Sequence, residues 1–148
     1  MRHLTIDASV AGRALDDVFP LLCDMEQYPK YSEAVLSLAV TGADNGAAIS
    51  AWTVRFGKGV ATWTQQDTVD RAATTIRFKR LSGDIENFTG AWVLRGSADG
   101  CTLTFTADFD IGMPALAEII EPMIEAMLRD NITAILKGLL GPQIVIRA

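Results

Sequence analysis

The stretch Trp63-Thr64-Gln65-Gln66-Asp67 decides the fold of this chain. Side chains alternate along a strand, so Trp63, Gln65 and Asp67 are predicted to point to one face. A dry core would leave Gln65 and Asp67 without hydrogen-bond partners, which is costly. The pattern therefore predicts a sheet that faces a partly polar cavity. Such a cavity in so small a protein indicates a ligand or a substrate.

Further strand-like segments surround this stretch. Six segments separated by short turns predict an antiparallel meander, and they span 35–41, 48–56, 60–69, 74–81, 86–95 and 101–110. Before them the pattern predicts a strand over 4–10, a helix over 15–23 and a short helix or turn at 28–31. A long amphipathic helix over 115–139 follows. This order predicts one α+β domain over residues 1–148, in which the long helix covers one face of the sheet.

Composition narrows the class of protein. The 148 residues include 13 basic and 18 acidic side chains, which give a formal net charge of −5. That balance argues against nucleic acid as a partner, because phosphate binding needs clustered lysine and arginine. No apolar run approaches the roughly 18 residues that span a membrane. The first residues lack a signal-peptide pattern, so a cytoplasmic protein is expected.

Histidine and cysteine are scarce in this sequence. His3 is the single histidine, and Cys23 and Cys101 are not spaced as a Cys-x-x-Cys pair. A Ser-His-Asp triad, a histidine-based metal site and a zinc or redox site are therefore not expected. The sequence predicts no metal and no cofactor.

A family resemblance rests on short motifs in a defined order. They are Asp24-Met25-Glu26-Gln27-Tyr28-Pro29-Lys30-Tyr31, Trp63-x-x-x-Asp67, Ile76-x-Phe78, Gly83-Asp84, Phe88-x-Gly90-x-Trp92, Gly100-Cys101-Thr102-Leu103 and Arg129-Asp130-Asn131. With these motifs the chain resembles the START/Bet v 1-like (SRPBCC) superfamily. It is most similar to the polyketide cyclase/dehydrase group, and next to the coenzyme Q-binding and RatA-like toxin group.

The resemblance implies a helix-grip fold. In that fold a curved antiparallel sheet of about seven strands surrounds a long C-terminal helix. Two short helices follow the first strand, and a cavity lies between the sheet and the long helix.

The chain departs from the related aromatase/cyclases at one position. In those enzymes an arginine follows a cavity tryptophan by four residues, and the same count from Trp63 reaches Asp67. A carboxylate in an apolar cavity has a raised pKa and is suited to take an α-proton flanked by carbonyls. Asp67 is therefore a candidate catalytic base. The alternative is that Asp67 lies at the cavity mouth or pairs with an arginine.

Two further residues are candidates for catalysis. Alternation carries Arg80 to the same face as Phe78, where a cation would stabilise an enolate. A β-bulge would turn Lys79 inward instead, and solvation of both side chains is the ordinary alternative. Asn131 interrupts the apolar stripe of the long helix, so it either binds a ligand carbonyl or ties the helix to a strand.

The candidate substrate-binding residues are mostly aromatic. Trp63 and Gln65 are suited to stack on and hydrogen-bond a flat oxygenated ligand, and packing in the core is the alternative for the tryptophans and Met127. The two tyrosines form either a gate over the cavity or simple surface packing. The predicted set is Trp63, Gln65, Tyr28, Tyr31, Phe78, Trp92 and Met127.

The resemblance implies two main functions. The leading hypothesis is a cofactor-independent cyclase/dehydratase that folds a poly-carbonyl chain in the cavity and promotes aldol-type ring closure with loss of water. The rival is a non-catalytic carrier of a quinone, a lipid or a similar hydrophobic molecule. A RatA-like interaction role ranks last, because the chain has no basic patch. The expected partners are a small hydrophobic or polyketide-like molecule and an acyl carrier protein that delivers it, with the chain as a monomer or a homodimer.

Overall fold

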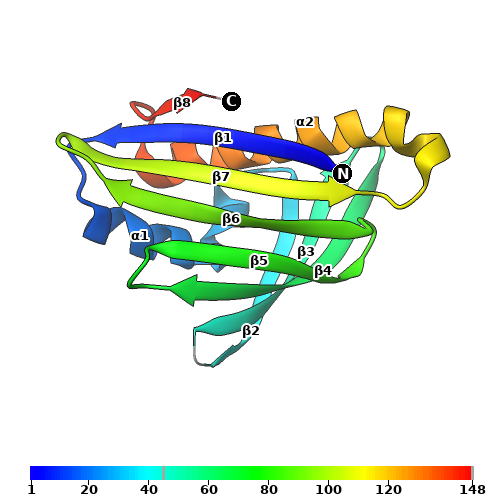
Figure 1. Ribbon diagram of the computed structural model, residues 1–148, viewed down its shortest axis with the longest axis horizontal. Helices are drawn as coiled ribbons and strands as arrows, with labels where there is room; N and C mark the ends of the chain where they lie inside the picture. The colour runs from blue at the N-terminus through cyan, green and yellow to red at the C-terminus, as the bar shows by residue number, and fades with distance from the viewer. Residues whose placement is uncertain (45, 148) are drawn as a thin grey trace.

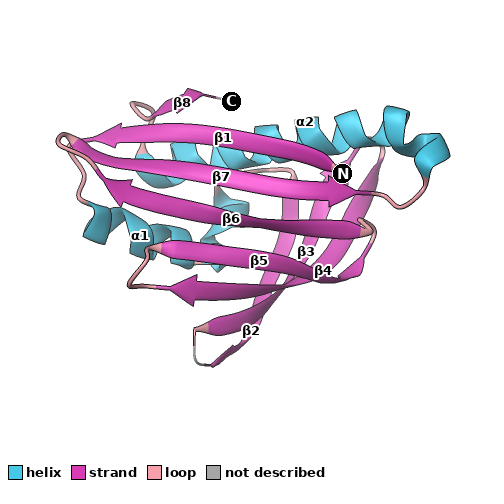
Figure 2. Cartoon of the chain, in the orientation of Figure 1, coloured by secondary structure: helices cyan, strands magenta, loops and turns pink. Residues whose placement is uncertain are grey.

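The computed structural model describes residues 1–44 and 46–147. Figure 2 shows two short helical segments early in the chain, one long helix near its end and a sheet of long strands. In chain order the elements are β1 (Arg2–Ala11), α1 (Leu15–Cys23), the 3-10 helix η1 (Met25–Lys30), β2 (Val35–Asp44), β3 (Ala47–Phe56), β4 (Gly59–Asp70), β5 (Thr75–Gly83), β6 (Asn87–Gly96), β7 (Gly100–Asp110), α2 (Pro114–Leu140) and β8 (Val145–Arg147).

The described strands join in an eight-stranded antiparallel sheet. Its order is β2-β3-β4-β5-β6-β7-β1-β8, so β2 to β7 each pair with their neighbours in the chain and β1 lies between β7 and β8. The sheet curves around α2, as Figure 1 shows. The predicted α+β helix-grip fold is confirmed. The sequence did not predict β8, because three residues are too few to show an alternation.

The inner face of the sheet forms the core. On β4 the side chains of Ala61, Trp63, Gln65 and Asp67 are buried, while the residues between them are half-buried or exposed. The predicted alternation of this strand is therefore confirmed. It places two polar side chains on the inner face, where they need partners inside the protein.

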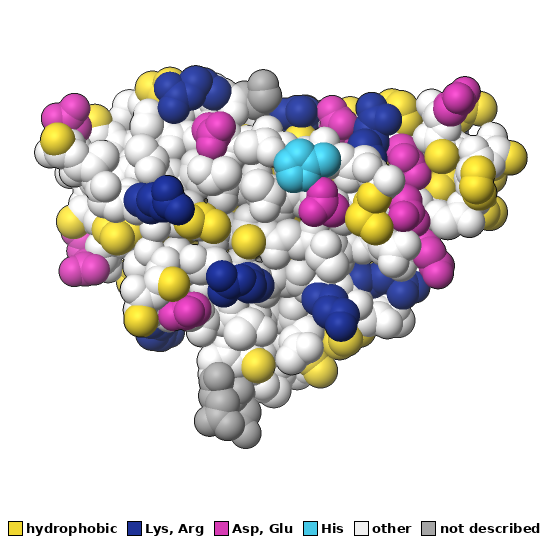
Figure 3. Space-filling model, in the orientation of Figure 1, with side chains coloured by type: hydrophobic (Ala, Val, Ile, Leu, Met, Phe, Trp, Pro, Cys, Tyr) yellow, Lys and Arg dark blue, Asp and Glu magenta, His cyan; other side chains and the backbone are white. Residues whose placement is uncertain are grey.

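The long helix α2 covers the sheet mainly with its C-terminal half. Its buried side chains begin at Ile124, and its first turns extend past the ends of the strands (Figure 1). Apolar side chains gather at this end of the molecule in Figure 3, and the exposed ones are Met113, Leu116, Ile119 and Met123. None of the helices that the structure describes is long and apolar enough to cross a membrane.

Candidate functional site

A cavity of about 40 Å³ lies between the inner face of the sheet and α2. Aromatic and aliphatic side chains form most of its wall, and the amide or carboxyl groups of Gln65, Asp67 and Asn131 interrupt it. This volume admits a group of only a few non-hydrogen atoms. We call it the inner cavity, and its lining residues are Met25, Tyr28, Trp52, Val54, Trp63, Gln65, Asp67, Ile76, Phe78, Phe88, Trp92, Phe105, Leu128, Asn131, Ile132 and Ile135.

Asp67 is the acidic group of the inner cavity, and its side chain is only 1% exposed. Ser50 Oγ donates a hydrogen bond to Oδ2 over 2.5 Å, and Gln65 Nε2 donates one to Oδ1 over 2.6 Å. Within residues 1–44 and 46–147 its carboxylate forms no ion pair. Asp67 therefore lies inside the protein rather than at the cavity mouth, and amide and hydroxyl groups satisfy it instead of an arginine.

The surroundings of Asp67 shift its pKa. Burial removes hydration from the carboxylate and raises the pKa above its ordinary value of 3.8, while the hydrogen bonds from Ser50 and Gln65 lower it in part. Burial is the larger of these effects. A carboxylate with a raised pKa is a stronger base than an exposed one, so Asp67 is suited to accept a proton in this cavity.

Two tryptophans donate hydrogen bonds to the side chains that contact Asp67. Trp63 Nε1 donates to Gln65 Oε1 over 2.8 Å, and Trp52 Nε1 donates to Ser50 Oγ over 2.9 Å. Trp52 pairs with Trp63 across β3 and β4, Ser50 pairs with Gln65, and the two indoles stack with ring centroids 5.6 Å apart. Neither Ser50 nor Trp52 was among the predicted site residues.

Asn131 lies on α2, and it borders both the inner cavity and a neighbouring cleft of about 280 Å³. Its side chain is 7% exposed, and Ser32 Oγ donates to its Oδ1 over 2.8 Å. The amide thus ties α2 to the segment after η1 and also faces the cavity wall. We call the neighbouring cleft the outer cleft, and its lining residues are Ala34, Arg55, Phe56, Gly57, Met123, Met127, Asp130 and Asn131.

Met127 does not line the inner cavity. It borders the outer cleft and also a further cleft of about 230 Å³ under the first half of α2, and Phe56 borders the same two clefts. The structure therefore places Met127 with Asn131 in the outer cleft rather than in the inner cavity with Asp67. A flexible thioether side chain at such a place adapts easily to different shapes.

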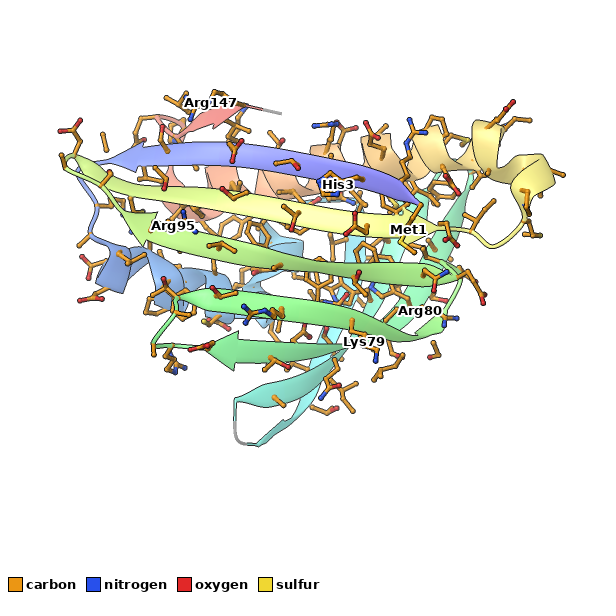
Figure 4. The ribbon with its side chains drawn as sticks, viewed as in Figure 1. Met1, His3, Lys79, Arg80, Arg95 and Arg147 are labelled. Atoms are coloured by element: carbon orange, nitrogen blue, oxygen red, sulfur yellow. The ribbon has the colours of Figure 1, made fainter. Side chains whose placement is uncertain are left out.

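Arg80 lies on the inner face of β5 but outside the wall of the inner cavity. It pairs with Gln65 just before a bulge at Leu81, and its Nη2 donates to the carbonyl oxygen of Gly83 over 3.0 Å. Lys79 is exposed on the opposite face. Figure 4 shows Lys79 and Arg80 toward the end of β5. The bulge does not turn Lys79 inward, because it follows Arg80 instead of preceding it.

The two tyrosines of the η1 region have different surroundings. Tyr28 is buried in the wall of the inner cavity, and its hydroxyl donates to the carbonyl oxygen of Leu22 over 2.5 Å. Tyr31 is 39% exposed and lies against Gly138 of α2, where its ring occupies the space of a β-carbon. The structure therefore separates the two residues that the sequence grouped as one gate.

The predicted aromatic residues Phe78 and Trp92 both line the inner cavity. Phe78 packs against Phe88 with ring centroids 5.0 Å apart, and Trp92 packs edge-on against Phe105 at 4.8 Å. Of the predicted site residues, the inner cavity brings together Tyr28, Trp63, Gln65, Asp67, Phe78, Trp92 and Asn131, and leaves out Tyr31, Arg80 and Met127. Over the described part of the chain, no three histidine, cysteine, aspartate or glutamate side chains are grouped as a metal ion would require.

Solved structures share this fold. A protein of Thermus thermophilus superposes with a TM-score of 0.82 at 20% identity, over 93% of this chain and 94% of that chain. The ZhuI aromatase/cyclase of Streptomyces sp. R1128 gives 0.80 at 19% identity, over 94% and 92%. A START superfamily protein of Mycobacterium smegmatis gives 0.73 at 14% identity, over 94% and 95%. Comparison with curated protein sequences gives no match.

The sequence profile of polyketide cyclase/dehydrase and lipid transport proteins matches residues 12–136. The match covers most of the 148 residues and spans the sheet strands and most of the long helix that enclose the inner cavity. The chain therefore belongs to the polyketide cyclase/dehydrase and lipid transport family.

Proposed function

We propose that this protein is a polyketide-type cyclase/dehydratase. The observation that carries the proposal is Asp67, a buried carboxylate held by two hydrogen bonds in an aromatic cavity. Such a group is suited to take a proton from a bound substrate and to return it later. The family description includes cyclisation and dehydration, and one structural neighbour is an aromatase/cyclase.

The proposed reaction begins with a proton transfer. Asp67 takes a proton from a methylene group that lies between two carbonyls, and the enolate attacks a carbonyl carbon further along the same chain. The alkoxide that forms takes the proton back, so Asp67 is regenerated. Loss of the new hydroxyl together with a neighbouring α-proton then releases water. The enclosed cavity contributes by holding the two reacting carbons close together, which supplies much of the acceleration.

Three other side chains support this step in the proposal. N–H groups of Gln65 and Asn131 border the same cavity and stabilise negative charge on the enolate oxygen. Arg80 acts from outside the cavity wall as a nearby positive charge. Its guanidinium group also donates a hydrogen bond to the carbonyl oxygen of Gly83.

The sizes of the cavities suggest how a long substrate lies. The inner cavity admits only the reacting segment, and the remainder extends past Asn131 into the outer cleft of about 280 Å³. Met127 moves aside to let the chain pass. Delivery by an acyl carrier protein and a cytoplasmic location belong to the same proposal.

A second candidate function is a non-catalytic carrier of a hydrophobic molecule. The clefts on both sides of Met127 favour it, because apolar side chains such as Met123, Ile120 and Ile124 form part of their walls. The family description also includes lipid transport. A carrier returns its ligand chemically unchanged, so the two functions differ in their products.

The test compares ring closure by the wild type and Asp67→Asn with a poly-β-ketone thioester, followed by mass spectrometry of the dehydrated product. The amide keeps the shape of the side chain but removes the base, so the rate is expected to fall at least about tenfold. Asp70→Asn, the same change at the exposed end of β4, serves as the matched control and should keep the wild-type rate. An unchanged rate in Asp67→Asn would rule out this mechanism.

A further inference from the structure

Trp63 fixes the orientation of Gln65. An indole N–H can only donate a hydrogen bond, and it meets the side-chain oxygen of Gln65 over 2.8 Å. The amide nitrogen of Gln65 therefore faces Asp67, whose Oδ1 accepts one of the two amide hydrogens over 2.6 Å. Turning the amide over would place its NH2 group against the indole N–H, so that two donors would face each other. All three side chains are buried, which makes the loss of these hydrogen bonds costly.

Trp52 orients Ser50 in a similar way. The indole N–H of Trp52 donates to Ser50 Oγ over 2.9 Å, and Ser50 Oγ donates to Oδ2 of Asp67 over 2.5 Å. The oxygen of Ser50 has a second lone pair, which could accept a hydrogen from a protonated Asp67. The hydrogen of Ser50 would then lose its acceptor, and this side chain is fully buried. Ser50 is therefore favoured as a donor to Asp67.

These two neighbours favour the ionised form of Asp67 over the neutral acid. Hydrogen bonds to a charged oxygen are roughly twice as strong as hydrogen bonds to a neutral one. The amide nitrogen of Gln65 has no lone pair, so it cannot accept a hydrogen from a protonated Asp67. A proton that Asp67 takes up is therefore better placed toward the cavity than toward Gln65 or Ser50.

Over the described residues, no charged side chain other than Asp67 lines the inner cavity, whether from η1, from β3 to β7 or from α2. Tyr28 of η1 is the second titratable group there, and burial raises the pKa of its hydroxyl, so it stays neutral. Arg80 of β5 lies outside the wall. Burial on its own favours the neutral acid at Asp67, and the hydrogen bonds from Ser50 and Gln65 oppose it.

We propose that Trp63 and Trp52 are positioning residues that fix the donors around Asp67. Trp63 acts through Gln65, and Trp52 acts through Ser50. This arrangement keeps the carboxylate ionised before a proton arrives, and it keeps an acquired proton on the cavity side. The proposal rests on the proposed function in taking Asp67 as the base. It adds the reason why Asp67 can both accept the proton and return it to the alkoxide, since no neighbouring side chain takes the proton from it.

Titration of the ligand-free protein tests this without a substrate. Aspartate labelled isotopically at the carboxyl carbon gives an NMR signal that moves as the group ionises, and the signal of Asp67 is the one absent from Asp67→Asn. In Trp63→Phe the amide of Gln65 is free to turn over and accept a hydrogen from protonated Asp67. The midpoint of the titration is therefore expected to rise by roughly one pH unit. Trp52→Phe should raise it in the same direction, because Ser50 is then free to turn.

Trp92→Phe is the matched control. Trp92 also lines the inner cavity, but within the described residues it makes no hydrogen bond to Gln65 or Ser50. The same loss of ring area alone would admit water, which hydrates the carboxylate and lowers the midpoint. The rise is therefore expected in Trp63→Phe and not in Trp92→Phe.

A midpoint that is unchanged or lower in Trp63→Phe, or that rises equally in Trp92→Phe, would overturn the proposal. If Trp63→Phe fails to fold, the comparison of Trp52→Phe with Trp92→Phe decides in the same way. The expected titrations without ring closure by the wild type would refute the cyclase and leave the positioning of Asp67 intact. Ring closure that depends on Asp67, without the expected titrations, would refute this inference alone.

Discussion

Gly90→Ala is expected to lower the free energy of unfolding by about 3 kcal/mol or more, because the site has no room for a methyl group. A β-carbon on Gly90 would lie 2.0 Å from the carbonyl oxygen of Thr106 and 2.5 Å from Cζ of Phe78. The first contact is with backbone in the neighbouring strand β7, which cannot rotate away. The second is with a ring that lines the inner cavity, so relief of the clash would also displace the cavity wall.

Thermal unfolding measures the effect of Gly90→Ala. A loss of this size corresponds to a fall in Tm of roughly 10 °C, at about 2–4 °C for each kcal/mol in a domain of this length. Gly96→Ala is the matched control, since it lies on the same strand β6 and a β-carbon there would meet no atom within 4 Å. Similar melting temperatures for both variants would show that Thr106 and Phe78 do not pack against Gly90 as closely as described.

Asp67→Asn is expected to make the protein more stable near neutral pH. Burial raises the pKa of Asp67 in the folded state above 3.8, so the folded protein binds this proton more tightly than the unfolded chain does. The stabilisation that protonated Asp67 gives to the folded protein is therefore fully present below about pH 3.8, and it is lost as the pH rises through the folded-state pKa. An uncharged amide avoids that loss, and its Nδ2 can donate to Ser50 Oγ in place of the carboxylate contact.

The pH dependence separates this ionisation effect from simple changes in packing. The difference in Tm between Asp67→Asn and the wild type should grow as the pH is raised above about 3.8 and level off once the pH exceeds the folded-state pKa, because the wild type alone carries the buried charge. Each kcal/mol recovered should raise Tm by roughly 2–4 °C. A difference that does not change with pH would contradict a raised pKa. Under the proposed function, the lost stability is the cost of keeping a base in the cavity.

The fold could be predicted from the sequence because its signals are local. Alternation along 60–69 placed Trp63, Gln65 and Asp67 on one face, and the structure confirms that they are buried together. Short turns between strands predicted the antiparallel order. The hydrogen bond between Ser50 and Asp67 was not predicted, because Ser50 lies on the neighbouring strand β3. The tight turn at Gly57-Lys58 could have predicted this contact. A turn there pairs Phe56 with Gly59, and the same register places Ser50 opposite Gln65.

Other features of the site depend on how segments that are distant in the sequence pack against one another. Met127 was predicted to bind the substrate or to pack in the core, but helical spacing cannot show that Leu128 and Asn131, and not Met127, line the inner cavity. Alternation placed Arg80 on the inner face, but not its position outside the cavity wall. Tyr31 differs from Tyr28 because Gly138 leaves room for its ring on α2. The positions of these three side chains result from packing between distant segments, so a local sequence pattern cannot predict them.

Under the proposed function, the inner cavity and the outer cleft together bind an oxygenated poly-carbonyl or aromatic compound. The most direct test is native mass spectrometry of the protein after incubation with an extract of its own host, followed by identification of the compound that stays bound. The proposal predicts a hydroxylated aromatic or poly-carbonyl compound whose retention falls in Asp67→Asn. An isoprenoid quinone or a fatty acyl chain, released unchanged and held equally well by Asp67→Asn, would contradict the cyclase and favour the carrier.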